Sequence, residues 1–249
     1  MPFIDNPRHA PDYDFTAEQY LRQLDEHGVQ FGVLAAASLF GDYNDYTVEA
    51  VRKYKRLRAT VILDPSVERN VLIDMKNAGI VGMRLMFRGV QALPDITTFE
   101  YRRLFRRIRD LDWHVHLHTE GPRLPALIDF LESTGVKLVI DHFGTPDPNK
   151  GVACEGFQRM IKSIEKGNTW VKMSAGYRIG KANAATYARE LLRAVGPERL
   201  LWASDCPFAS FEQTMTYQLA LDALYDWVPD AKTRRKITAD NPVALYFAS

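Results

Sequence analysis

The chain has 249 residues, of which 46% are hydrophobic, so it is long enough to bury one substantial core. Its 32 basic and 31 acidic residues nearly cancel, which excludes a large surface field for nucleic acid or an anionic membrane. Two cysteines cannot form a disulfide framework, and no apolar run is long enough to span a membrane. We therefore expect one cytoplasmic domain over residues 1–249, in which any preference for anions is local.

The expected elements alternate between strands and helices along the chain. Apolar runs rich in β-branched residues predict strands at 32–37, 59–63, 81–86, 114–118, 137–141, 169–173 and 199–203. Helical patterns occupy 16–27, 44–56, 67–78, 97–110, 123–134, 153–166 and 183–195, and two or three further helices are expected within 211–247. This alternation predicts a parallel α/β sheet of the (β/α)8 TIM-barrel type.

The eighth strand of such a barrel is missing from this count. The first fifteen residues hold three prolines and lead directly into a helix that opens with a capping box of Thr16 and Gln19. We therefore expect the first strand to be missing, or reduced to a remnant at residues 3–5. The free sheet edges would favour association with a second copy of the chain, or aggregation.

Five of the apolar runs end in a polar or charged side chain. These are Arg84 in VGMRLMF, His118 in HVHLHT, His142 in KLVIDHFG, Arg178 in VKMSAGYR and Asp205 in LLWASDCP. The carboxyl ends of the strands of a parallel barrel converge on one mouth, so this pattern predicts one catalytic pocket.

The run HVHLHT carries three alternating histidines. Because side chains alternate across a strand, its apolar residues should face the helices and its histidines the barrel interior. His118 is nearest the mouth and is best placed to meet a ligand. His114 and His116 are expected to be hydrogen-bonded interior residues.

The same alternation applies to the strands that lead to His142 and Asp205. It places His142 on an inward face with Leu138 and Ile140, and it places Asp205 at the end of another inward face. The pair Asp141-His142 is by itself a weak signal, because a surface turn can place two such residues side by side. A helix N-cap is the structural alternative for Asp205.

The segments VIDHFGTPD, WVKMSAGYR and LLWASDCP, taken as a set, resemble the amidohydrolase-related (β/α)8 barrels, on the branch of 2-pyrone-4,6-dicarboxylate lactonase. The likeness covers nearly the whole chain and implies hydrolysis of an ester-like bond in a small carboxylated ring. It implies that Asp205 acts on the attacking water, as general base or metal ligand, and that His142 polarises the substrate carbonyl. Two rival interpretations are a metal-dependent decarboxylase of aromatic acids and a truncated, non-catalytic barrel.

The resemblance also implies which residues bind a small anionic substrate. Arg84 and Arg178 match arginines that bind substrate carboxylates, and Arg88 lies near a second such arginine. His9 falls where a lactonase tyrosine contacts the substrate. His118 stands where the pyrone lactonases carry tyrosine, while metal-dependent relatives place a histidine ligand on this strand. The structural alternative for Arg84 is a salt bridge inside the barrel.

The family's Asp-x-His-x-His motif on the first strand is absent from this sequence. Either the sequence starts too late or a natural form has lost the motif, and we favour a late start. Because those histidines are the family's strongest ligands, we expect no tightly held metal and no other cofactor. A divalent ion such as zinc would have to use His118, His142 and Asp205.

Overall fold

Seven parallel strands form one sheet in this protein, for which a computed structural model describes residues 2–248, apart from the side chains at 181 and 182. The strands are β1 Gly32–Leu34, β2 Leu57–Val61, β3 Ile80–Met86, β4 His114–His118, β5 Lys137–Ile140, β6 Thr169–Met173 and β7 Leu200–Trp202. Each strand pairs with its neighbour in chain order, and β1 and β7 are the two edges. The sheet therefore curls into a half-barrel rather than a closed barrel.

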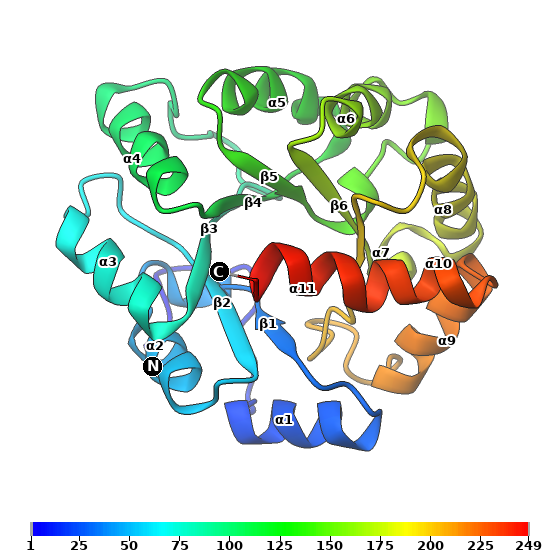
Figure 1. Ribbon diagram of the computed structural model, residues 1–249, viewed down its shortest axis with the longest axis horizontal. Coiled ribbons are helices and arrows are strands. Elements are labelled where there is room, and N and C mark those ends of the chain that lie inside the picture. The colour runs from blue at the N-terminus through cyan, green and yellow to red at the C-terminus, as the bar shows by residue number, and fades with distance from the viewer. Residues whose placement is uncertain (1, 249) are drawn as a thin grey trace.

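Helices surround the outside of this sheet (Figure 1). The longer ones are α1 Ala17–Glu26, α2 Asp45–Lys53, α3 Arg69–Ala78, α4 Phe99–Asp110, α5 Leu124–Ser133, α6 Glu155–Glu165, α8 Lys181–Val195 and α9 Tyr217–Trp227. The single turn α7 Gly176–Ile179 follows β6, and α10 Ala231–Arg235 leads through a π-helical turn into α11 Asn241–Tyr246. All seven expected strands and seven expected helices are present to within a few residues. No helix in the described residues is long and apolar enough to cross a membrane.

The N-terminal segment contains no strand, as expected. Within residues 2–31 the backbone makes no sheet pairing, and Ile4 N–H instead donates to the Leu39 carbonyl at 2.9 Å. The segment reaches α1 through the expected capping box, in which Thr16 Oγ1 accepts from Gln19 N–H at 3.2 Å and Gln19 Oε1 accepts from Thr16 N–H at 2.6 Å. The prolines of this segment disfavour a longer strand, because proline cannot donate to a sheet ladder.

The half-barrel interior is closed at one end by α11. Tyr246 of α11 packs with Val139 and Leu201, and its ring lies 5.2 Å from that of His114 at the start of β4. The Asn241 side chain donates to the carbonyl of Leu200 at 2.8 Å, which fastens α11 to the start of β7. Figure 1 shows α11 lying across the sheet. The amino ends of the strands are therefore covered, and the open mouth lies at the carboxyl ends.

The inward face expected for β5 is wrong. Val139 faces the small interior cluster, whereas Leu138 and Ile140 belong to the large core between sheet and helices. The strand ends at Ile140, and His142 lies in a 3-10 turn with a φ of 48°. Asp141 is still extended and lies two residues after Val139, so it takes the inward position, and the turn then carries His142 to the mouth.

Candidate active site

One cavity of about 1470 Å³ opens at the carboxyl ends of the strands. It continues along the slot between the unpaired edges of β1 and β7 and is bounded below by α11. Its lining includes every residue that the sequence singled out, namely His9, Arg84, Arg88, His118, His142, Arg178 and Asp205. The structure thus brings these seven residues together, and their chemical roles stay predictions.

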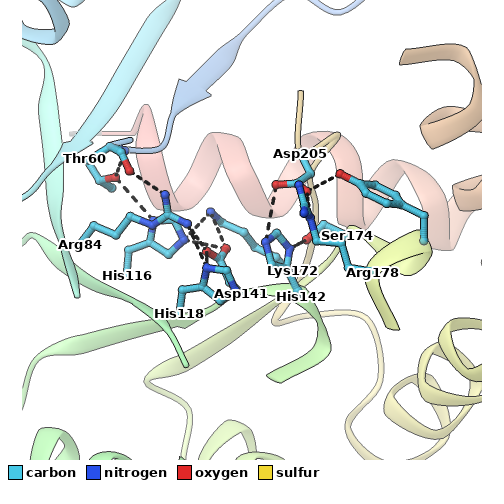
Figure 2. A network of polar contacts seen from close by, with 12 residues as sticks. Thr60, Arg84, His116, His118, Asp141, His142, Lys172, Ser174, Arg178 and Asp205 are labelled. Carbon is cyan, nitrogen blue, oxygen red and sulfur yellow. Dashed lines mark hydrogen bonds and ion pairs between the residues drawn. The ribbon is translucent and has the colours of Figure 1, made fainter. Parts of the chain in front are cut away.

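Asp141 is the hub of the polar network in this cavity (Figure 2). Its carboxylate is 2% exposed and accepts from Arg84 Nη2 at 2.8 Å through Oδ2. The other oxygen, Oδ1, lies 2.7 Å from His116 Nε2 and 3.2 Å from Lys172 Nζ. Both oxygens are therefore occupied. The alternative of a salt bridge for Arg84 is observed, and the same side chain also lines the cavity.

Electrostatics keep this hub charged. Burial alone would raise the pKa of Asp141, but the groups that contact it, first His116 and Lys172, hold that pKa well below its usual value. Burial lowers the pKa of Lys172, although Asp141 opposes that shift. His116 is completely buried and hydrogen-bonded, as expected, and burial lowers its pKa well below the usual histidine value.

Asp205 is the centre of a second group, on the loop after β7. Its Oδ2 accepts from Tyr177 Oη at 2.5 Å and from Arg178 Nε at 2.7 Å, and both donors come from the single helical turn α7. Its Oδ1 faces His142 Nε2 at 3.6 Å and has no shorter contact to a described residue. Burial would raise the pKa of Asp205, but His142 and Arg178 lower it below the usual value. Asp205 does not cap a helix, because the next helix begins after Thr216.

The two histidines at the mouth lie edge to face. The rings of His118 and His142 are 4.7 Å apart at an interplanar angle of 87°. His142 Nδ1 lies 2.7 Å from Ser174 Oγ, which leaves Nε2 directed towards Asp205, whereas His118 Nε2 is buried and has no hydrogen-bond partner. Burial lowers the pKa of both side chains, so both are neutral near pH 7.

His9 and Arg88 lie on loops that border the mouth. His9 Nδ1 is 3.3 Å from Ser210 Oγ, and its Nε2 is 3.2 Å from Glu212 Oε1, so this side chain ties the N-terminal segment to the loop after β7. Arg88 lies just beyond β3, where its backbone N–H donates to the His118 carbonyl at 3.0 Å. Its Nη1 atom is buried without a partner.

The metal ligand set named from the sequence needs a correction. Within the described residues, the donor atoms that cluster within 4.8 Å of one another belong to His118, Asp141 and His142, and Asp205 is not among them. Asp205 stands apart because its Oδ2 is held by Tyr177 and Arg178. A divalent ion at the cluster would lie beside the cations that contact Asp141. This charge environment does not fit a divalent ion.

Sequence reasoning treated Asp141 only as part of a weak pair with His142, and it missed Lys172, Ser174 and Tyr177. A signal for Lys172 was available, because a lysine between apolar residues in a strand needs a counter-charge where it is buried. The position of Tyr177 depends on α7, a turn too short to have a detectable period.

The sequence is similar over nearly its whole length to a known protein family and to characterised hydrolases. A family model described as Amidohydrolase matches residues 4–248. The chain is 30% identical over 264 residues to a 2-pyrone-4,6-dicarboxylate hydrolase of Comamonas testosteroni, covering 99% of this chain and 85% of that one. It is 28% identical to a 4-sulfomuconolactone hydrolase of Hydrogenophaga intermedia, covering 98% of this chain and 83% of the relative.

A solved structure has the same architecture. The crystal structure of a probable 2-pyrone-4,6-dicarboxylic acid hydrolase from Acinetobacter baumannii, with citric acid bound, matches with a TM-score of 0.92 at 30% identity. The match covers 98% of this chain and 93% of that one. The resemblance drawn from VIDHFGTPD, WVKMSAGYR and LLWASDCP is confirmed. The chain therefore belongs to the amidohydrolase family, as a lactonase-type hydrolase.

Proposed function

We propose that this enzyme hydrolyses the ester bond of a small carboxylated lactone, with Asp205 as the general base. The observation that carries the proposal is the asymmetry of the Asp205 carboxylate. Oδ2 is held by Tyr177 and Arg178, while Oδ1 faces the cavity beside His142. An ionised carboxylate with one open oxygen can take a proton from water, and its lowered pKa keeps it ionised at neutral pH.

His142 is placed to stabilise the charge that develops on the carbonyl. The Ser174 hydroxyl, 2.7 Å from Nδ1, can donate to that nitrogen, which makes Nε2 the protonated and donating atom. A substrate carbonyl beside Nε2 would then receive a hydrogen bond on its oxygen. Such a donor strengthens as the oxyanion forms.

The reaction follows from these two side chains. Asp205 takes one proton from water, and the resulting hydroxide adds to the lactone carbonyl carbon. Collapse of the tetrahedral intermediate breaks the ring C–O bond, and the proton held by Asp205 passes to the departing ring oxygen. His118, which lies against His142, is a further donor towards the same oxygen. No step requires a metal ion.

Arginines supply the binding energy for the acidic groups of the substrate. Arg84 and Arg178 both line the cavity, and each also forms an ion pair with a carboxylate, that of Asp141 or Asp205 respectively. Arg88 has a donor nitrogen in the cavity without a partner. The names of the two curated relatives describe lactones that carry carboxylate or sulfonate groups, and the Acinetobacter structure holds a polycarboxylic acid. These likenesses support a small anionic lactone as the substrate.

The test measures hydrolysis of a panel of carboxylated lactones by the 249-residue protein, which is first dialysed against a chelator. Proton release reports the rate of hydrolysis. We expect Asp205→Asn, which keeps the shape of the side chain, to lower kcat by about 100-fold or more with a small change in KM. Asp12→Asn, an exposed carboxylate on the same cavity, is the matched control and should keep the wild-type rate. Full activity in Asp205→Asn would contradict the proposal, and release of carbon dioxide from aromatic acids would favour the decarboxylase instead.

A further inference from the structure

Arg8 belongs to the active-site cavity although it lies outside every helix and strand. The segment that carries it is fixed on one side, where His9 contacts Ser210 and Glu212 on the loop after β7. On the other side, a Cβ added at Gly89 would lie 3.5 Å from Arg8 Cδ, so the Arg8 side chain lies over the loop after β3. Arg8 thus bridges the two loops that border the mouth, beside Arg88.

Arg8 and Arg88 have no ion-pair partner within the described residues. Within the described residues neither guanidinium forms a side-chain hydrogen bond or an ion pair, whereas Arg84 is paired with Asp141 and Arg178 with Asp205. Burial lowers the pKa of Arg8, and the charges of Arg88, Arg178 and Arg84 lower it further. Four guanidinium groups therefore repel one another around one opening, and a bound anion would relieve that repulsion.

Apart from His9 Nε2, which lies 3.2 Å from Glu212 Oε1, three buried nitrogens of the described cavity lining have no hydrogen-bond partner. They are Arg84 Nε, Arg88 Nη1 and His118 Nε2. His118 is 4% exposed, so bulk water does not satisfy its nitrogen. Buried polar atoms in native proteins are nearly always hydrogen-bonded, and a group of unpartnered ones at a site indicates a ligand with acceptor atoms.

The charges at the mouth do not cancel. Two buried or half-buried carboxylates, those of Asp141 and Asp205, face the cations Arg8, Arg84, Arg88, Lys172 and Arg178. Asp12 and Asp14 also line the cavity, but both are solvent-exposed and therefore screened. The two histidines at the mouth are neutral. Glu120 also acts on Arg88, but it is ion-paired with Arg123 at 3.7 Å. The five cations therefore exceed the two cavity carboxylates by three.

We propose that Arg8 is a specificity-determining residue that, together with Arg84 and Arg88, selects a substrate with three negative charges. The inference deepens the proposed function, since the substrate class becomes a small lactone with three acidic groups that are ionised at neutral pH. The binding preference itself can be measured without any hydrolysis. Arg8 makes the third anion subsite, because it lines the mouth over the loop after β3 and forms no ion pair within the described residues.

The experiment compares two ligands that differ by one carboxylate. Propane-1,2,3-tricarboxylate and glutarate share the same terminal carboxylates on the same chain length, and isothermal titration calorimetry at pH 8 measures both with the intact protein. We expect the tricarboxylate to bind at least about tenfold more tightly, the effect of one charge-assisted contact. Arg8→Gln should reduce this ratio to about two or less, chiefly by weakening the tricarboxylate, and Arg8→Lys should keep most of it.

Arg52→Gln, an exposed arginine on α2 outside the cavity, is the matched control and should keep the wild-type ratio. Equal binding of both ligands by the wild-type protein would overturn the inference, and so would an unchanged ratio in Arg8→Gln. The wild-type ratio decides the matter even if a variant fails to fold. Hydrolysis of lactones without a preference for the tricarboxylate would refute the inference alone, whereas that preference without any hydrolysis would refute the proposed function alone.

Discussion

Replacement of Asp141 by asparagine should destabilise the fold strongly. The substitution keeps the shape of the side chain and removes the negative charge that contacts Arg84, His116 and Lys172. The Arg84 and Lys172 side chains are only 11% and 13% exposed, so solvent cannot replace the lost carboxylate. The asparagine side chain would also present an amide N–H₂ to groups that are themselves donors.

The magnitude follows from this burial. Removal of one partner of a buried ion pair typically costs about 3–5 kcal/mol. For a chain of this size each kcal/mol lowers Tm by about 2–4 °C, so the expected loss is roughly 6–20 °C. Part of the loss comes from repulsion between the cations that Asp141 separates. Adding Lys172→Met to Asp141→Asn should therefore recover at least about 1 kcal/mol.

Urea unfolding followed by circular dichroism measures these differences. The control is Asp25→Asn, which breaks an ion pair of 2.5 Å with Arg56 where the Asp25 side chain is 61% exposed, and which should cost less than about 1 kcal/mol. If Asp141→Asn cost no more than this control, the hub would not be a buried ionic centre and the reasoning would be refuted.

The pH dependence has a defined sign. The pKa of Asp141 is held well below its usual value in the folded state, so the unfolded chain binds its proton at a higher pH than the folded one. Its stabilising effect is fully present above the unfolded pKa of about 3.9 and is lost as the pH falls through the folded pKa. The gap between wild type and Asp141→Asn should therefore be constant from pH 7 to pH 5 and should narrow only below about pH 4.

Three further predictions concern the reaction and the assembly. Because the pKa of Asp205 lies below its usual value, lactone hydrolysis should stay level on the acid side down to about pH 5, and a rate that halves near pH 6 would contradict its role as the base. Dialysis against a chelator should leave kcat within about twofold, because cations surround the Asp141 cluster, and stoichiometric zinc in protein purified without added metal would contradict this. The unpaired edges of β1 and β7 should promote self-association, so light scattering should show a dimer or larger, and a highly stable monomer would refute the expectation.

The barrel architecture could be predicted because it depends on local periodicity. Seven apolar runs and the helices between them specify a parallel sheet, and the prolines before Thr16 predict the missing strand. The convergence of Arg84, His118, His142, Arg178 and Asp205 followed from one rule, that the carboxyl ends of parallel strands meet.

The details of the site depend on backbone that leaves the regular pattern. Asp141, rather than His142, continues the inward face of β5, because its backbone is still extended and it lies two residues after the inward-facing Val139, whereas His142 has a positive φ. Arg8 sits in a segment without any period, and only its contacts across the mouth bring it into the cavity. The spacing alone does not tell which face of β5 is inward, since that depends on the elements packed against each face, and the position of Arg8 depends on loops far away in the chain.

The two buried carboxylates of the cavity, those of Asp141 and Asp205, differ in how many of their oxygens the protein already engages. Asp141 has both oxygens engaged by cations and by His116, so an incoming water would have to displace one of them. Asp205 is anchored through one oxygen only, and the anchors Tyr177 and Arg178 both approach Oδ2. The other oxygen, Oδ1, is directed towards His142 (Figure 2). The same residue type therefore holds the half-barrel together in one position and is available to react in the other.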